Sequence, residues 1–183
     1  DIVAIPVLKG KKTVHETFAG AVATYTIEAL MHDGKALQSG TSHYLGTGFA
    51  KAYGISYLGK ENCLETPHQT SWGVSTRLLG AIIMVHGDDN GLVLPPHVAP
   101  TQVVIVPIRQ KEEGILDACY KIADTLKKQG VRVKVDDDDS KTPGWKFSEY
   151  EMKGVPLRIE VGPRDLAEGK AVMTKRVNGE KVV

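Results

Sequence analysis

Apolar and polar residues alternate along much of the first half of the chain. The alternation predicts β-strands over residues 2–8, 21–31 and 35–46. Between the last two of these segments, Asp33 and Gly34 form a dipeptide that is typical of a tight turn. Consecutive strands joined by short turns pair with their neighbours, so we expect an antiparallel meander in this part of the chain.

The stretch from Val74 to Val85 shows no such alternation, and it is long enough for a helix that is buried on most sides. Arg77 lies in the first turn of this predicted helix, although a permanent charge is unusual at the start of a buried segment. After the helix, Pro95, Pro96 and Pro100 lie close together, which is typical of a boundary between domains.

From Thr101 onward, apolar strand-like segments alternate with amphipathic helical ones. We expect strands over residues 102–108, 131–139, 155–162 and 170–177, and helices over residues 111–130 and 142–154. Gly130 suits the end of the first helix, and Pro143 suits the start of the second. This order predicts a small α/β domain with a largely parallel sheet covered by helices. The chain is therefore expected to contain two domains, residues 1–98 and residues 99–183.

Both ends of the sequence look cut. The chain opens on Asp1 in a strand-like run without an initiator methionine, and it closes just after the hairpin-forming pair Asn178-Gly179. We therefore expect a fragment of a longer protein.

Composition narrows the class of protein without indicating a function. A chain of 183 residues with 42% hydrophobic and 25% charged residues can bury a substantial core. Its net charge of +1 gives no general attraction to nucleic acids or membranes, so a local patch would have to hold such a partner.

The sequence has neither a secretion signal pattern nor an apolar run of the roughly 18 residues that a membrane span requires, so we expect a cytoplasmic protein. Cys63 and Cys119 lack the spacing of metal ligands, and we expect both to be buried thiols.

Two features of the first domain suit a ligand site. Gln38, Thr41 and His43 fall within one predicted strand that is followed by two glycines, so hydrogen-bonding side chains lie beside space for a ligand. A lone histidine on a strand is more often structural, but the three residues together favour a site. Small residues precede Arg77, where the exposed N–H groups of a helix start attract an anion. Arg77 could equally form an ion pair with a carboxylate, and the residues alone leave both interpretations open.

Acidic residues occur in two clusters, and we assign a metal ion to neither. His86, Asp88 and Asp89 precede an Asn-Gly pair, a composition that we interpret as a tight turn. Asp136–Asp139 directly follow a strand, and we interpret them as a solvated loop. We therefore expect no metal site in this chain.

Three segments together are specific enough to carry a family resemblance. Residues 40–55 read GTSHYLGTGFAKAYGI, residues 69–108 begin with QTSWGVSTR, and residues 142–165 read TPGWKFSEYEMKGVPLRIEVGPRD. In this order they resemble prolyl-tRNA synthetase of the archaeal and eukaryote-like type, and the resemblance extends over the whole chain. It implies an α+β part followed by an α/β part. The first is the C-terminal part of a class II catalytic domain with an antiparallel sheet and motif 3 at residues 69–96, and the second is an anticodon-binding domain.

The resemblance also implies roles for particular residues. The ATP-binding residues would be Gln38, Thr41, Ser75 and Arg77, and Arg77 would be the catalytic arginine of motif 3. The proline-binding residues would be Phe18 and His43. In the second domain, the residue types suited to stacking on anticodon bases or to bonding their edges are Trp145, Phe147, Tyr150, Glu151, Lys153 and Arg158. Of these, the anticodon candidates are Trp145, Glu151, Lys153 and Arg158.

The implied reaction joins L-proline to tRNA(Pro) in two steps. Proline attacks the α-phosphate of ATP, supplied with Mg2+, and the terminal ribose of tRNA then takes the prolyl group from prolyl-adenylate. Motif 1 at the homodimer interface and motif 2 would lie upstream of Asp1, and a zinc-bearing extension would lie beyond Val183. We therefore expect no zinc in this fragment and no useful activity from it alone. The alternative is a non-catalytic tRNA- or protein-binding module with the synthetase fold, but the full set of ligand-contacting residues favours the enzyme.

Overall fold

The computed structural model describes all 183 residues, and these form two compact units. Residues 5–85 make up one unit, and residues 86–183 make up the other together with residues 1–4. Residues 86–98 thus belong to the C-terminal unit. The division into a catalytic part, residues 1–98, and an anticodon-binding domain, residues 99–183, stays a prediction. None of the helices is both long enough and apolar enough to cross a lipid bilayer.

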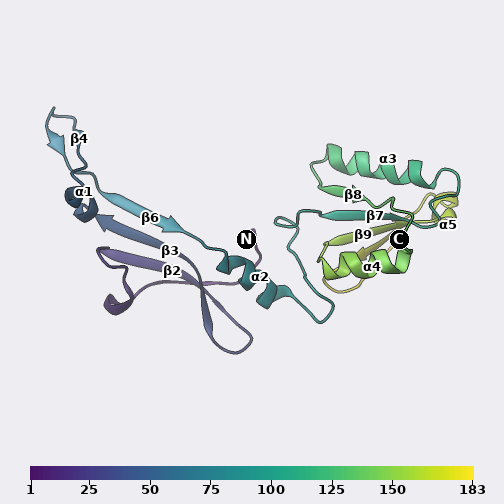
Figure 1. The fold of residues 1–183 in the computed structure, drawn as a ribbon, viewed down its shortest axis with the longest axis horizontal. Coiled ribbons are helices and arrows are strands. Elements are labelled where there is room, and N and C mark those ends of the chain that lie inside the picture. The colour runs from purple at the N-terminus through teal and green to yellow at the C-terminus, as the bar shows by residue number, and fades with distance from the viewer. The chain divides into compact units, whose positions relative to one another are not determined.

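The unit of residues 5–85 is built on a four-stranded antiparallel sheet (Figure 1). Its strands, in spatial order, are β1 (Leu8–Lys11), β2 (Ala23–Leu30), β3 (Ala36–Gly46) and β6 (Gln69–Gly73). The meander predicted for β2 and β3 is confirmed, and a hydrogen bond from the Met31 N–H to the Lys35 carbonyl (2.8 Å) closes their turn. The strand β6 was not predicted, because its residues are mostly polar or small and show no apolar alternation.

The strand predicted over residues 2–8 is wrong. The strand β1 begins only at Leu8, and residues 2–7 form no strand. Pro6 has no N–H to donate, and Ala4 has a φ of 52°, so this stretch cannot form a regular ladder. The remaining short elements of the unit are the 3-10 helix η1 (Val14–Glu16), α1 (Gly48–Ala52), and the hairpin of β4 (Tyr57–Leu58) and β5 (Leu64–Glu65).

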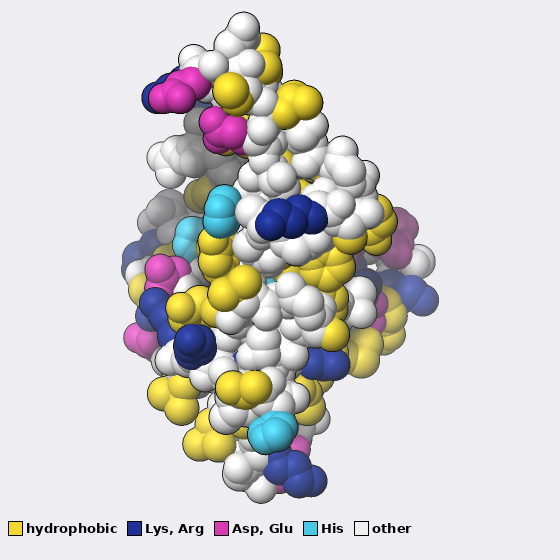
Figure 2. All heavy atoms as spheres, turned by 90° about the vertical axis from the view of Figure 1, so that its left-hand side faces the viewer, with side chains coloured by type: hydrophobic (Ala, Val, Ile, Leu, Met, Phe, Trp, Pro, Cys, Tyr) yellow, Lys and Arg dark blue, Asp and Glu magenta, His cyan; other side chains and the backbone are white.

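The helix predicted from Val74 to Val85 corresponds to α2 (Arg77–His86), with Arg77 as its first residue. The prediction that this helix is buried on most sides is wrong. Only Ala81 and Ile82 are buried, whereas Leu79 is 62% exposed. A helix that is apolar on all sides does not indicate by itself which partner covers it. Exposed apolar side chains are not confined to this helix: Figure 2 shows hydrophobic side chains spread among charged ones over one face of the molecule.

The C-terminal unit has a five-stranded sheet between helices (Figure 1). In spatial order its strands are β11 (Lys181–Val182), β10 (Val172–Lys175), β9 (Leu157–Val161), β7 (Val103–Pro107) and β8 (Val133–Val135), and its helices are α3 (Ile115–Lys128), α4 (Pro143–Met152) and α5 (Pro163–Ala167). Val103 and Ile105 pack in one core cluster with residues of α3. Val104 and Val106 pack in a second cluster with Tyr150 of α4. Because both faces of β7 are covered, its sequence is a continuous apolar run.

The predicted α/β domain is confirmed, but its sheet is mixed rather than largely parallel. The strand β7 pairs in parallel with β8 and β9, whereas the pairs β9–β10 and β10–β11 are antiparallel. A parallel connection needs a long crossover, which α3 and α4 supply. The connection from β9 to β10 has only ten residues, 162–171, with the five-residue α5 as its one helix, and the turn at Asn178-Gly179 joins β10 to β11. These short connections make the strands run antiparallel.

Two local predictions in this unit are wrong. The helix predicted from residue 111 begins only at Ile115, because Gly114 before it is in the left-handed region with a φ of 81°. Asp136 does not lie in a solvated loop. It is buried, and its Oδ1 lies 3.2 Å from the Nζ of the buried Lys146.

The two cysteines have different environments. Cys119 of α3 is buried as expected, and burial raises the pKa of its thiol to about 11. Cys63 is exposed, contrary to expectation. It lies between β4 and β5, which are two-residue strands that bury little side-chain surface.

Candidate functional site

One face of the N-terminal sheet carries rows of polar side chains. Residues directly opposite one another in antiparallel strands point to the same face. Thr24 of β2 lies opposite His43 of β3, and His43 lies opposite Ser71 of β6. In the next row, Thr26 lies opposite Thr41. The pairing therefore puts Thr41 and His43, two of the predicted ligand residues, on one face.

Gln38 joins this face because of a β-bulge in β3. Gln38 and Gly40 pair with successive residues of β2, so Ser39 between them has no partner on that strand. An extra residue inverts the alternation of side chains beyond it. Gln38 therefore points to the same face as Thr41, although the two are an odd number of positions apart.

These side chains line a hollow of about 380 Å³. The predicted residues in its lining are Gln38, Thr41, His43, Ser75 and Arg77, and the segment 71–74 forms the rest of one wall. Of the residues predicted to bind ATP or proline, only Phe18 lies outside this lining. Its ring centroid is 4.9 Å from that of His43, so it borders the same group.

Arg77 has no carboxylate partner. Its Nη1 reaches only the carbonyl of Gln38, at 3.5 Å, and it takes part in none of the ion pairs of the structure. The side chain is exposed at the start of α2. A cation in the first turn of a helix faces the positive end of the helix dipole, which is unfavourable unless an anion binds there. The geometry therefore favours an anion site over a structural ion pair.

A buried threonine connects the two residues predicted to bind proline. Thr24 is 1% exposed, and its hydroxyl accepts a hydrogen bond from the Phe18 N–H (3.1 Å). The same hydroxyl lies 2.9 Å from Nδ1 of His43. Thr24 was not predicted as a site residue. The polar residues at every second position of β2, Thr24, Thr26 and Glu28, are the signal that could have indicated it.

A tight turn holds Phe18 in place. The Ala21 N–H donates to the Phe18 carbonyl (2.9 Å), and Gly20 has a φ of 86°. A Cβ atom at Gly20 would lie 2.9 Å from the ring of Phe49, so the turn needs glycine for space as well as for its backbone. The rings of Phe18 and Phe49 are 6.5 Å apart and form an apolar border next to His43.

Lys12 was also not predicted, and it fixes the orientation of Gln38. Its Nζ donates to Oε1 of Gln38 at 2.8 Å. With its oxygen occupied in this way, the Gln38 amide offers its NH2 group as the donor for a ligand.

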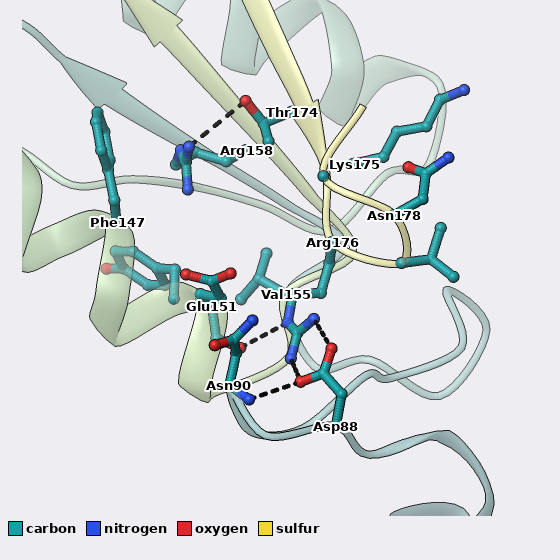
Figure 3. A pocket seen from close by; sticks show the side chains of 13 residues that line it. Asp88, Asn90, Phe147, Glu151, Val155, Arg158, Thr174, Lys175, Arg176 and Asn178 are labelled. Carbon is teal, nitrogen blue, oxygen red and sulfur yellow. Dashed lines mark hydrogen bonds and ion pairs between the residues drawn. The ribbon is translucent and has the colours of Figure 1, made fainter. Parts of the chain in front are cut away.

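A second hollow, of about 500 Å³, lies in the C-terminal unit (Figure 3). Among its lining residues are Phe147 and Glu151 of α4, Arg158 of β9 and Arg176 after β10. The guanidinium of Arg158 lies over an aromatic ring, with its Cζ 4.1 Å from the Phe147 centroid. Its Nη2 also pairs with Glu160 at 2.9 Å, so the guanidinium is held rigidly at the wall.

Arg176 holds the floor of this hollow together. Its Nη1 and Nη2 donate to the two carboxylate oxygens of Asp88 at 2.7 and 2.6 Å, and its Nε donates to the Glu151 carbonyl at 2.8 Å (Figure 3). Hydrogen bonding to Arg176 lowers the pKa of the Asp88 carboxyl to about 2. The turn predicted here is confirmed, because Asp88 and Gly91 exchange two backbone hydrogen bonds of 3.1 Å.

The structure does not bring all four predicted anticodon residues together. Glu151 and Arg158 line the second hollow, whereas Trp145 and Lys153 do not. Lys153 pairs with Glu149 one helical turn away, and Trp145 is 48% exposed on α4. No three or more His, Cys, Asp or Glu side chains converge as they would around a metal ion.

Comparisons with known proteins agree with this architecture. Residues 102–183 match the family model described as "Anticodon binding domain". A proline–tRNA ligase of Lachnospira eligens is 63% identical over 182 residues, which cover 100% of this chain and 38% of that protein. The proline–tRNA ligase of Clostridium botulinum (strain Loch Maree / Type A3) is 60% identical over 183 residues, with the same shares. The chain is similar to proline–tRNA ligases along its whole length. It spans about 38% of the length of these relatives.

A solved structure supports the same relationship. The crystal structure of prolyl-tRNA synthetase from Cryptosporidium parvum, complexed with L-proline and AMP, is 46% identical in sequence and has a TM-score of 0.88. The match covers 99% of this chain and 40% of that chain. The predicted fold is confirmed: part of a class II synthetase catalytic domain with an antiparallel sheet is followed by an α/β anticodon-binding domain.

Proposed function

We propose that this chain is part of a proline–tRNA ligase, which attaches L-proline to tRNA(Pro) through prolyl-adenylate. One observation carries the proposal: five of the six residues expected to bind ATP or proline line a single hollow on the sheet. The chain spans about 38% of its relatives, so activity is expected only from a longer protein that includes motifs 1 and 2. The alternative of a non-catalytic module is not favoured, because the side chains that would bind the ligands are present and face one another.

In the first step, the proline carboxylate attacks the α-phosphate of ATP and pyrophosphate leaves. Arg77 would bind the nucleotide through its guanidinium, either at phosphate oxygens or stacked on the base. Gln38, Thr41 and Ser75 would supply hydrogen bonds to the same ligand. No side chain needs to act as a nucleophile, since the substrate supplies its own, and catalysis consists of positioning and of stabilising phosphate charge.

Proline would be selected by shape next to the nucleotide. The exposed ring of Phe18 offers an apolar wall, and His43 offers a polar anchor. Proline is small and rigid, so an aromatic wall with few polar groups suits its recognition.

In the second step, the terminal ribose hydroxyl of tRNA takes the prolyl group from prolyl-adenylate and AMP leaves, while the C-terminal unit binds the anticodon. The second hollow supports this assignment, because splayed bases need flat surfaces and edge hydrogen bonds. Arg158 and Phe147 offer flat surfaces, and the carboxylate of Glu151 offers hydrogen bonds to base edges. Trp145, exposed on α4, and Lys153, just after the end of that helix, remain candidates.

Further features follow from the same proposal. We assign Mg2+ to the phosphates of ATP, without a ligand from this chain, and we assign zinc to no residue of the chain. The archaeal and eukaryote-like type, the homodimer and the cytoplasmic location stay predictions, as does the expectation that no membrane is a partner.

Arg77→Ala in the full-length protein tests the proposal. Proline-dependent exchange of pyrophosphate into ATP should fall by about 10²- to 10³-fold, the usual loss when a preorganised donor to developing charge is removed. Arg164→Ala, which replaces an exposed arginine of α5, should leave the exchange unchanged. Normal exchange by the Arg77 variant would remove Arg77 from the mechanism. A full-length parent that fails to charge tRNA(Pro) would refute the function itself.

A further inference from the structure

The hydroxyl of Thr24 has two partners and no third. It receives the Phe18 N–H at 3.1 Å and lies 2.9 Å from Nδ1 of His43. The residue is 1% exposed, so bulk solvent does not reach the hydroxyl to replace a missing partner. The single hydrogen of this hydroxyl must therefore find its acceptor among these two contacts.

The hydrogen count fixes the direction of the bond to His43. A backbone N–H can only donate, so the contact with Phe18 uses a lone pair of the Thr24 oxygen and leaves its hydrogen free. If His43 carried a proton on Nδ1, Thr24 would have to accept again, and its own hydrogen would have no acceptor. A buried donor without a partner is strongly disfavoured. Thr24 therefore donates to Nδ1, and the ring proton of His43 is on Nε2.

We propose that Thr24 is a positioning residue that sets the tautomer of His43 and, through Phe18, the second wall of the amino-acid pocket. His43 lines the hollow, and its Nε2 has no partner within the protein. In this tautomer, Nε2–H is a donor for an oxygen acceptor, such as the carboxylate or acyl oxygen of the bound amino acid. The pocket assignment rests on the proposed function, whereas the tautomer follows from the contacts of Thr24 alone.

The tautomer can be measured directly in the full-length protein labelled with 15N-histidine. Two-bond 1H–15N correlations distinguish a proton on Nδ1 from one on Nε2, and His43→Gln identifies the signal. The parent and Thr24→Ser should carry the proton on Nε2, while Thr24→Val, which keeps the shape but loses the hydroxyl, should show both forms. Thr26→Val is the matched control, because the Thr26 hydroxyl bonds the Gly40 carbonyl and does not contact His43.

Kinetics of proline-dependent exchange give the second measurement. In Thr24→Val the KM for proline should rise about tenfold, equivalent to about 1.4 kcal/mol, with the KM for ATP within about twofold of the parent. Thr24→Ser should restore the parent value. A merely structural role would instead lower the melting temperature and change both KM values together.

The outcomes separate the two proposals. A parent His43 with its proton on Nδ1 overturns the role of Thr24, even if the valine variant does not fold. An unchanged tautomer and an unchanged KM for proline in a folded Thr24→Val overturn it as well. If the parent shows no proline-dependent exchange, the proposed function fails, and the NMR spectra alone then decide whether Thr24 sets the tautomer.

Discussion

Replacement of Lys146 by methionine should destabilise the C-terminal unit by about 3–5 kcal/mol. The Nζ of Lys146 lies 3.2 Å from Oδ1 of Asp136 and donates to the Asp136 carbonyl at 2.7 Å. The two side chains are only 3% and 10% exposed. At this separation and an effective dielectric constant of about 20, the charges attract by about 5 kcal/mol. Methionine keeps the apolar length of the side chain, so the main loss is the ion-pair partner of a buried carboxylate, which keeps the hydrogen bond from the Asp138 N–H (3.2 Å).

The assay follows urea unfolding by tryptophan fluorescence and far-UV circular dichroism. The chain has two tryptophans, one in each unit, so a Trp72→Phe background makes Trp145 of α4 the sole reporter of the C-terminal unit. Lys170→Met is the matched control. Lys170 pairs with Glu168 at 3.0 Å, but these side chains are 54% and 63% exposed, so the cost should be about 1 kcal/mol or less.

Two results would contradict this reasoning. If Lys146→Met loses no more stability than Lys170→Met, burial does not determine the strength of the pair. The double variant Lys146→Met with Asp136→Asn removes both charges and should be more stable than Lys146→Met alone. A double variant less stable than the single one would show that lost packing, and not an unpaired charge, causes the effect.

Two further predictions concern backbone space and thiol reactivity. Gly154→Ala should cost about 1–3 kcal/mol more than Gly130→Ala in the urea assay. Both glycines have positive φ, but only at Gly154 would a Cβ meet a backbone oxygen, that of Leu92, at 2.6 Å. Equal losses of stability in the two variants would contradict this prediction. At pH 8 a thiol reagent should modify native Cys63 and spare Cys119, whose pKa of about 11 keeps the buried thiol protonated. In the folded Cys63→Ser variant only Cys119 remains, and rapid labelling of that variant would refute the prediction.

The parts of the fold that the sequence predicted are those in which one local signal dominates. The continuous apolar run of β7 and the amphipathic pattern of α3 are such signals. No such local signal indicates the direction of β10, because a strand has the same pattern of residues whether it pairs in parallel or antiparallel. The length of the preceding connection decides that direction: residues 162–171, which include the five-residue α5, are too few for a parallel crossover.

Residues that act through partners distant in sequence were the hardest to predict. Threonine is an ordinary strand former, so Thr24 has no distinguishing feature until the register puts it opposite His43. Asp136 begins a run of four aspartates that suggests solvent, yet Lys146 on the following helix neutralises it in the interior. In both cases the pairing, and not the residue type, determines the role.

The bulge at Ser39 shows how register decides the composition of the hollow. In a regular strand, Thr41 and His43 share a face, but Gln38 would lie on the other one, and period-two reasoning alone would exclude it from the site. The sequence groups the three residues only because they are polar and fall within one strand-like stretch, and the resemblance implies that they bind ligands. The unpaired Ser39 reconciles the grouping with the geometry, since it returns Gln38 to the face of His43. Ser39 itself lines the hollow, and the bulge that it forms decides which neighbouring side chains of β3 share that face.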